Sequence, residues 1–323
     1  MKALRFHEAG RLADVLKLED IPQPAPSPTQ VLIEVKASPV NPSDIYFIQG
    51  AYRRKPVYPQ TAGLEGSGIV VTCGENVISA RPGDHVSFRL PGTWSQYCLA
   101  EDSSLIRITR DIPFSISSQI GLNPMTAFAL LSETSLQKDD WLLLNTASST
   151  VAGIILQMAV AKGINVIALI RDLVHVPALN ALGARHVFLQ EDPDLVRKIE
   201  EITAPKGIRA FFDAIGGKQL ENMMPLMSQY ATIVCYGNIS NGEKAAISNV
   251  HLVYRNLTVK GFGIDRWLSL RSADQIGKIY ADIAEDLYTK KIVLREIPSV
   301  RLEEFIPYWS HLGHPDKVII TIG

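Results

Sequence analysis

Residues 141–170 read WLLLNTASSTVAGIILQMAVAKGINVIALI. The stretch opens on the apolar run 141–144, continues through residues 151–161 with small and medium apolar side chains, and closes on the largely apolar run 165–170. Runs of these lengths predict a buried strand, a helix and a second buried strand. Strands that are apolar throughout are typical of a parallel sheet covered on both faces. We therefore expect a strand–helix–strand unit here.

The same alternation continues toward the carboxyl end of the chain. Further helices are expected at 175–182, 195–202 and 219–227, and further strands at 186–189, 210–213 and 231–236. Helices that alternate with apolar strands favour an α/β fold with a doubly wound parallel (Rossmann) sheet. Residues 256–262 (NLTVKGF) predict a strand at the edge of this sheet.

The first third of the chain has a different character. Strand-like runs occupy 31–40, 63–74 and 83–90, with Pro- and Gly-rich turns between or before them. Short strands separated by such turns indicate a mostly β region.

The end of the chain is expected to return to this β region. A helical stretch at 274–287, a strand-like run at 291–300 and a terminal strand at 317–323 are too few to fold alone, and the last strand needs a sheet. We therefore predict a first domain from 1–121 and 267–323, and a dinucleotide-binding domain from 122–266.

Composition limits the function classes. The 323 residues are 46% apolar and 20% charged, with a formal net charge of -1, which is typical of a soluble globular chain and excludes disorder, collagen and coiled coil as global descriptions. A chain without a basic excess does not neutralise a phosphate backbone, so we expect a small-molecule substrate and no nucleic acid.

Cysteine usage and targeting signals point to a cytoplasmic protein. Cys73, Cys98 and Cys235 are odd in number and widely spaced, which fits neither a disulfide framework nor a CxxC zinc site. The amino-terminal residues lack the apolar core of a signal peptide. The most apolar window, 151–170, is interrupted by Gln157, Lys162 and Asn165, so no membrane span is predicted.

Several segments in order resemble the zinc-free branch of the medium-chain dehydrogenase/reductase superfamily. They are NPSDIYFIQGAY (41–52), AGLEGSGIVVTCGENV (62–77), RPGDHV (81–86), NPMTAF (123–128), LGARHV (182–187), FFDAIGG (211–217) and VCYG (234–237). NPMTAF, IRD (170–172) and Trp267 after GFG most resemble 2-enoyl thioester reductases, whereas YRRKP (52–56) equally resembles NADPH:quinone oxidoreductases. The resemblance implies a GroES-like catalytic domain split around the Rossmann domain.

The resemblance also bears on metals. Zinc-dependent relatives place a Cys in the segment that here reads Asn41-Pro42-Ser43-Asp44 and a His where Leu64 stands. Two ligands of a catalytic zinc are then missing, and a zinc held by fewer than three protein ligands is not a normal catalytic site. We expect no metal.

The turn after residue 144 is the expected binding site of the cofactor diphosphate. Relatives usually carry glycines there, whereas this chain has Ser148, Ser149, Thr150 and Val151, whose hydroxyls and backbone N–H groups can donate to phosphate at a helix N-terminus. The alternative is a hydroxyl-capped helix start without a ligand.

The end of the second strand predicts which cofactor binds. The resemblance assigns Ile170 to the slot that holds an acidic residue in NAD-dependent relatives, and Arg171 follows. A carboxylate would repel a 2′-phosphate and an arginine would pair with it, so NADPH is favoured. The alternative is a solvated Arg171 paired with Asp172.

The resemblance places further residues around the cofactor. Tyr236, Gly237 and Asn238 are expected beside the nicotinamide ribose, and Asn123 with Thr126 are expected to face it. Each has an alternative as a turn residue or helix cap.

The substrate side is expected in the β-rich domain. Tyr52 ends NPSDIYFIQGAY where such reductases carry a proton-donating Tyr, and a phenol stays protonated at neutral pH. The alternative is a packed Tyr at the domain junction. Asn41 and Trp267 are assigned to the substrate pocket, although aromatic core packing is an equal alternative for Trp267.

Three functions stay open at this point. They are an NADPH-dependent 2-enoyl thioester reductase, an NADPH:quinone oxidoreductase, and a nucleotide-binding structural or regulatory protein without turnover. Arg53, Arg54 and Lys55 would attract an anionic carrier such as coenzyme A, or form an ordinary solvated loop. Pairing of the edge strand 256–262 with its mate predicts a homodimer.

Overall fold

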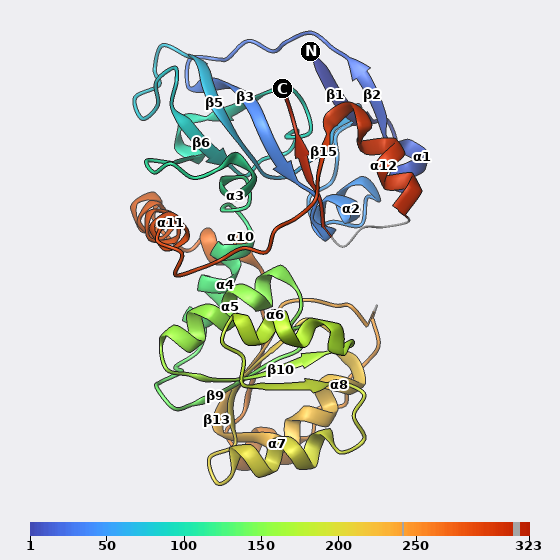
Figure 1. Cartoon of the computed structure of the whole chain (residues 1–323), viewed down its shortest axis with the longest axis vertical. Helices are drawn as coiled ribbons and strands as arrows, with labels where there is room; N and C mark the ends of the chain where they lie inside the picture. Colours follow the sequence, from blue (N-terminus) through green and yellow to red (C-terminus); the bar gives the residue numbers. More distant parts are fainter. Residues whose placement is uncertain (241, 313–316) are drawn as a thin grey trace. The chain divides into compact units, whose positions relative to one another are not determined.

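A computed structural model describes residues 1–240, 242–312 and 317–323. The chain forms two compact units (Figure 1). Unit 1 contains Met1–Met125, Ala273–Lys290 and Leu294–Gly323, and unit 2 contains Thr126–Ser272 and Lys291–Val293. The chain thus passes between the units at 125/126, 272/273, 290/291 and 293/294. The first two passages lie near the domain boundaries expected at 121/122 and 266/267, which stay a prediction.

Unit 2 is the doubly wound parallel sheet that the sequence predicts. Its six strands run in the order β11-β10-β9-β12-β13-β14, and every neighbouring pair is parallel. The strands are β9 (Trp141–Leu144), β10 (Asn165–Ile170), β11 (His186–Leu189), β12 (Ile208–Asp213), β13 (Met227–Cys235) and β14 (Thr258–Gly261). β14 lies at the edge, as expected for residues 256–262.

Helices cover both faces of this sheet. They are α4 (Asn123–Ser132), which begins at the end of unit 1, α5 (Thr150–Ala161), α6 (Val176–Ala181), α7 (Leu195–Thr203), α8 (Gly217–Met223), α9 (Asn249–Tyr254) and α10 (Ile264–Leu268), with short 3-10 turns at Leu173–His175 and Met224–Leu226. Figure 1 shows α5 and α6 on one side of the sheet and α7 and α8 on the other. Cover on both faces explains why β9 is apolar throughout and β10 is apolar from Val166 to Ile170.

Unit 1 is mostly β. A larger sheet follows the order β15-β16-β3-β5-β6-β8 with β7 added on β3, and a smaller one the order β2-β1-β4. The strands are β1 (Lys2–Phe6), β2 (Lys17–Asp20), β3 (Gln30–Pro39), β4 (Gln60–Thr61), β5 (Gly66–Cys73), β6 (His85–Phe88), β7 (Tyr97–Glu101), β8 (Leu105–Arg107), β15 (Ser299–Arg301) and β16 (Ile319–Thr321). The carboxyl-terminal strands therefore complete the sheet of the first third, as expected for the tail.

Few helices accompany these sheets. They are α1 (Leu12–Val15), α2 (Pro42–Ile48), α3 (Phe114–Ser117), α11 (Ala273–Tyr288) and α12 (Phe305–Leu312), with 3-10 turns at Asp102–Ser104 and Leu302–Glu304. α11 is held to unit 1 by the Tyr280 hydroxyl, which donates to the Gly121 carbonyl at 3.1 Å, and by an Arg110–Glu285 ion pair.

Two predicted elements differ most from the structure, while the strand expected at 231–236 is β13, Met227–Cys235. The helix expected at 219–227 ends at Met223, and Met227 already belongs to β13. Pro225, which has no N–H for the helical ladder, lies in the intervening 3-10 turn. The strand-like run 291–300 is irregular until Ser299. Ile292 and Leu294 are buried and Val293 is exposed, as in a strand, but the Val293 N–H and C=O bond to the Gln157 side chain instead of a neighbouring strand.

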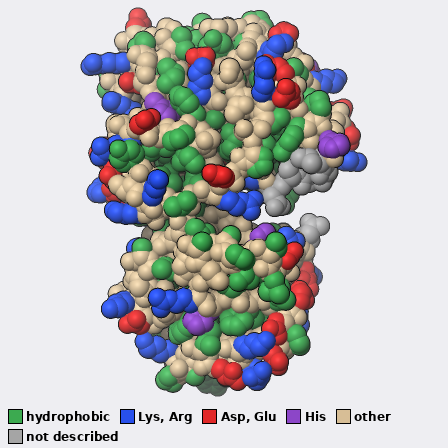
Figure 2. All heavy atoms as spheres, viewed as in Figure 1, with side chains coloured by type: hydrophobic (Ala, Val, Ile, Leu, Met, Phe, Trp, Pro, Cys, Tyr) green, Lys and Arg blue, Asp and Glu red, His purple; other side chains and the backbone are tan. Residues whose placement is uncertain are grey.

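Side-chain charges are mixed on the visible surface. Figure 2 shows Lys and Arg interleaved with Asp and Glu over the face drawn there. In the described part of the chain, moreover, none of the helices has the length and apolarity that a bilayer crossing requires.

Candidate active site

The carboxyl ends of the strands in unit 2 bring most of the predicted cofactor residues to one edge of the sheet. β9 has β10 on one side and β12 on the other. The chain builds β10 and β11 on the first side of β9 and then crosses to add β12, β13 and β14 on the second side. Ligands of open α/β sheets bind at such a switch point, beyond the carboxyl ends. The turn that follows β9 lies there.

A buried hydrogen-bond network fixes this turn. The Asn145 amide donates to Asp213 Oδ1 at 2.5 Å and to Gln219 Oε1 at 2.8 Å, and its oxygen accepts from the Ala214 N–H. Asp213 also accepts from the Gly216 N–H, so the ends of β9 and β12 are locked together. Sequence reasoning did not assign Asn145 or Asp213, although a polar residue at the end of an apolar strand is the signal that marks both.

The turn itself presents hydroxyls. Thr146 has a φ of 48°, which is uncommon for a β-branched residue. Ser149 caps α5 by accepting from the Ala152 N–H, while Ser148 and Ser149 are exposed. Thr150 and Val151 form the first turn of this helix, whose free N–H groups attract anions.

Arg171 follows β10 directly. Ile170 is buried, whereas Arg171 is exposed and forms no ion pair with any described residue. Asp172 instead accepts from the Val174 N–H at 2.9 Å, so the alternative pairing of Arg171 with Asp172 is not formed. The end of β10 therefore offers a guanidinium.

Tyr236, Gly237 and Asn238 follow β13. The Tyr236 hydroxyl is buried and has no partner at hydrogen-bond geometry among the described residues. Burial raises the pKa of Tyr236 to about 12, an effect that the nearby Thr146 and Ser149 hydroxyls partly oppose. A side chain at Gly237 would collide with the Ala214 carbonyl, since a Cβ there would lie 2.5 Å from its oxygen.

Asn238 has a local role in the structure. Its oxygen accepts from the Gly242 N–H at 3.1 Å, which is the turn role left open by the sequence. The unpartnered phenol of Tyr236, the exposed Ser148 and Ser149 hydroxyls and the exposed Arg171 together fit the phosphates and sugar hydroxyls of a nicotinamide dinucleotide.

Thr126 and Trp267 belong to unit 2 by their contacts. Both are buried. The Trp267 ring meets Phe128 edge-on at 6.3 Å between centroids and lies 3.2 Å below the Arg271 guanidinium. These contacts are those of a packed aromatic, the alternative left open by the sequence, and its assignment to a substrate pocket stays a prediction.

Tyr52 lies in unit 1, just after α2. Its N–H donates to the Tyr46 carbonyl at 2.9 Å, and its half-buried ring packs against the apolar core of the unit. The Arg53 guanidinium lies 5.5 Å from the ring centroid and 3.5 Å from the phenol oxygen.

Asn41 and Asn123, far apart in sequence, are joined in unit 1. The Asn123 amide donates to Asn41 Oδ1 at 3.3 Å, and the Asn41 amide donates to Glu65 Oε1 at 2.7 Å. Asp44 accepts from the Asn41 N–H at 2.7 Å in a capping box at the start of α2. The sequence assigned Asn41 and Asn123 but neither carboxyl group.

Buried charges accompany these amides. Burial raises the pKa of Asp44 to about 8 and also raises that of Glu65. Burial lowers the pKa of Lys317 to about 8, against the attraction of both carboxyl groups. The Lys317 ammonium donates to Gln119 Oε1 at 2.9 Å. Lys317 thus acts on both buried acids, and Arg89 also opposes the raised pKa of Glu65.

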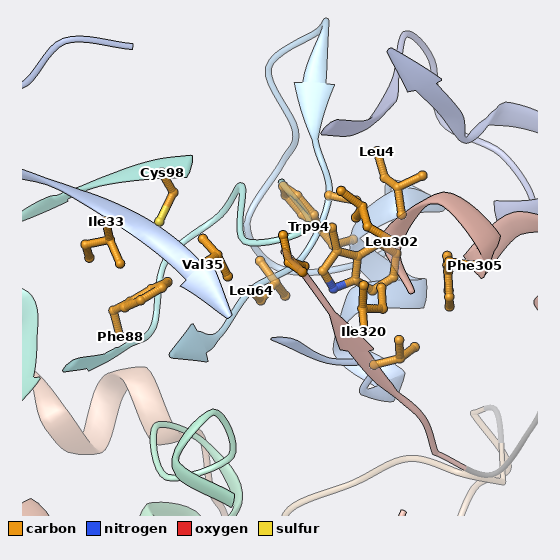
Figure 3. Close-up of a cluster of buried hydrophobic side chains, with 14 of the residues drawn as sticks. Leu4, Ile33, Val35, Leu64, Phe88, Trp94, Cys98, Leu302, Phe305 and Ile320 are labelled. Carbon is orange, nitrogen blue, oxygen red and sulfur yellow. The ribbon is translucent and has the colours of Figure 1, made fainter. Parts of the chain in front are cut away.

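Leu64 stands where zinc-dependent relatives carry a histidine. Figure 3 shows its side chain within the apolar core of unit 1, in a cluster with Val35 and Trp94. In the described residues, His, Cys, Asp and Glu form no group of three that could hold a metal ion. The zinc-free assignment stays a prediction that chelation can test.

Two family models match the chain. The alcohol dehydrogenase GroES-like domain matches residues 27–122, and the zinc-binding dehydrogenase model matches residues 150–274. The enoyl-[acyl-carrier-protein] reductase, mitochondrial, of Xenopus tropicalis is 30% identical over 320 residues, covering 94% of this chain and 89% of its own. The chain belongs to the medium-chain dehydrogenase/reductase superfamily.

Other members of the superfamily extend this result. The Arabidopsis thaliana enoyl-[acyl-carrier-protein] reductase, mitochondrial, is 31% identical and covers 99% of this chain and 88% of its own. The crystal structure of Escherichia coli quinone oxidoreductase complexed with NADPH superposes with a TM-score of 0.88 at 21% identity, covering 99% of this chain and 100% of its own. The expected fold is therefore confirmed, and the chain is an oxidoreductase of the medium-chain superfamily.

Proposed function

We propose that this oxidoreductase uses NADPH to reduce the conjugated C=C bond of a 2-enoyl thioester. The exposed Arg171 at the end of β10 carries the cofactor assignment, because a guanidinium pairs with a 2′-phosphate where a carboxylate would repel it. The substrate assignment rests on the two relatives named as enoyl-[acyl-carrier-protein] reductases, which match the chain over nearly its whole length.

The residues of the chain bind and orient the cofactor in this proposal. Ser148, Ser149 and the α5 N-terminus would hold the diphosphate, and the buried Tyr236 hydroxyl near Thr146 and Ser149 would bond to the cofactor. Thr126, Gly237 and Asn238 are proposed to line the nicotinamide half. The bound nicotinamide supplies a hydride to the substrate.

Tyr52 is the proposed proton donor. Reduction of a conjugated thioester builds negative charge on the carbonyl oxygen and its adjacent carbon, and a positioned acid stabilises that charge. Tyr52 offers a half-buried phenol with Arg53 beside it. Exposed Arg53 and Arg54 would also attract the anionic carrier of an acyl group.

We also propose a homodimer formed through unit 2. β14 is an unpaired sheet edge. On α9, the apolar side chains of Val250, Val253 and Tyr254 are 58%, 66% and 74% exposed. A sheet edge and an exposed apolar helix surface favour pairing between two copies. A cytoplasmic location stays a prediction, supported by the three free thiols.

Steady-state oxidation of NADPH tests the function. With crotonyl-CoA we expect rapid oxidation, a KM that rises with ionic strength, and little oxidation with a simple quinone. Tyr46→Phe on α2, whose side chain is 50% exposed, is the matched control for Tyr52→Phe. Oxidation with the quinone alone would favour the quinone oxidoreductase, and NADPH binding without oxidation of either would favour a protein without turnover.

A further inference from the structure

The Asn41 side chain is hydrogen-bonded at both ends. Its amide nitrogen donates to Glu65, and its oxygen accepts from the Asn123 amide. All three residues are at least 90% buried, with exposed fractions of 3% for Asn41, 1% for Glu65 and 7% for Asn123. A primary amide has one donor end and one acceptor end, so the direction of one bond determines the direction of the next.

Glu65 sets the direction of this series. Glu65 Oε1 accepts from the Asn41 NH₂ group, so the Asn41 oxygen is turned to Asn123. Asn123 must then turn its own NH₂ group to Asn41, which leaves the Asn123 oxygen free to accept. The orientation of the Asn123 amide is therefore set by Glu65 through the Asn41 amide between them.

The surroundings hold Glu65 in place. The Ser38 hydroxyl donates to the Glu65 backbone carbonyl at 2.6 Å. Burial raises the pKa of Glu65, and the Lys317 ammonium is the strongest of the groups that oppose this rise. Lys317 is itself buried and bonded to Gln119, so its charge stays close to the carboxylate.

We propose that Glu65 is a positioning residue that, through Asn41, presents the Asn123 oxygen as an acceptor for a hydrogen-bond donor on the nicotinamide half of the cofactor. A ribose hydroxyl or the carboxamide N–H has this chemistry. The inference rests on the proposed use of NADPH and adds Glu65, which binds nothing directly, to the residues that determine cofactor affinity.

Glu65→Gln is the first test, because a glutamine can donate to Asn41 and allow both amides to reverse. We expect NADPH to bind about tenfold more weakly, the loss of roughly one hydrogen bond. Adding Asn41→Asp moves the carboxylate to the middle position, where it accepts from both neighbours and restores the direction at Asn123. This double variant should bind NADPH within about twofold of the wild type.

Two controls separate positioning from folding. Ser38→Ala removes a hydrogen bond to the Glu65 backbone but leaves the direction of the amides unchanged, so its NADPH affinity should match the wild type. The fragment 2′,5′-ADP, which lacks the nicotinamide half, should bind every variant equally. Thermal unfolding midpoints of all variants report any loss of structure.

The outcomes distinguish the two claims. A wild type that binds neither NADPH nor 2′,5′-ADP contradicts the proposed function. NADPH affinity unchanged in Glu65→Gln, or a double variant no better than the single one, overturns the positioning role. If Glu65→Gln does not fold, Asn123→Ala removes the free oxygen without touching the carboxylate, and full NADPH affinity in that variant overturns the proposal equally.

Discussion

Arg171→Ala should convert an NADPH-preferring protein into one that binds NADPH and NADH alike. The structure places Arg171 directly after β10, exposed, with no ion pair to a described residue that a phosphate would have to break. Ile170 beside it contributes no competing carboxylate. The side chain is therefore available to a 2′-phosphate.

The expected size of the effect follows from this exposure. Hydrogen bonds to charged groups contribute about 1.5–3 kcal/mol. Because solvent and salt screen an exposed pair, the lower end applies, about 1.5 kcal/mol or roughly tenfold in Kd for NADPH. NADH, which lacks the 2′-phosphate, should lose nothing. Higher ionic strength should weaken NADPH binding in the wild type more than in the variant.

Quenching of intrinsic tryptophan fluorescence during titration with each cofactor measures both affinities. Arg185→Ala is the matched control, since this exposed arginine precedes β11 at the amino end of the same sheet and should affect neither cofactor. Equal affinity of the wild type for NADPH and NADH, or NADPH binding unchanged in Arg171→Ala, would refute the assignment of this residue.

Four further predictions follow from other parts of the molecule. Tyr52→Phe should lower kcat and kcat/KM together by roughly 10²-fold while the Kd for NADPH stays constant, and a variant with full kcat would remove the proposed proton donor. Val253→Asp on α9 should convert the dimer to a monomer in light scattering, and a wild type already monomeric at micromolar concentration would refute the interface. Dialysis against a strong chelator should leave the rate unchanged, and recovery of a lost rate with zinc would contradict the zinc-free assignment. The Asp44 carboxyl group binds its proton more tightly in the folded protein, where its pKa is about 8, than in the unfolded chain, where its pKa is 3.8. The free energy of unfolding should therefore fall as pH rises between these two values. Urea titrations at pH 5 and pH 8 should show this fall in the wild type and a smaller one in Asp44→Asn, and identical pH dependence would be evidence against a protonated, buried Asp44.

The sheet of unit 2 was predictable because strands that are buried on both faces appear in the sequence as short, almost continuous apolar runs. The strands at 141–144, 165–170 and 186–189 have the predicted bounds. The helix predicted at 219–227 was too long, because apolar periodicity does not show that Pro225 interrupts the helical hydrogen bonds. The run 291–300 was misjudged because Ile292 and Leu294 alternate with exposed Val293 as in a strand, whereas the Val293 backbone bonds to the Gln157 side chain.

The candidate site was less accessible to sequence reasoning. Arg171 was assigned by the resemblance to NAD-dependent relatives, and the hydroxyls of the turn after β9 by their position at a strand end. The contacts of Glu65 with Asn41 and of Lys317 with Gln119 join residues that only the folded sheet of unit 1 brings together. A charged residue in an apolar stretch marks such a group, but the sequence does not name its partner.

Transfer of deuterium tests the central claim most directly. NADPH labelled with deuterium at the transferred position of the nicotinamide is incubated with the protein and crotonyl-CoA, and the product is analysed by tandem mass spectrometry. The account predicts butyryl-CoA that carries one deuterium, at the carbon β to the thioester carbonyl. Unlabelled product, or no butyryl-CoA while the same protein oxidises NADPH with a quinone, would contradict it.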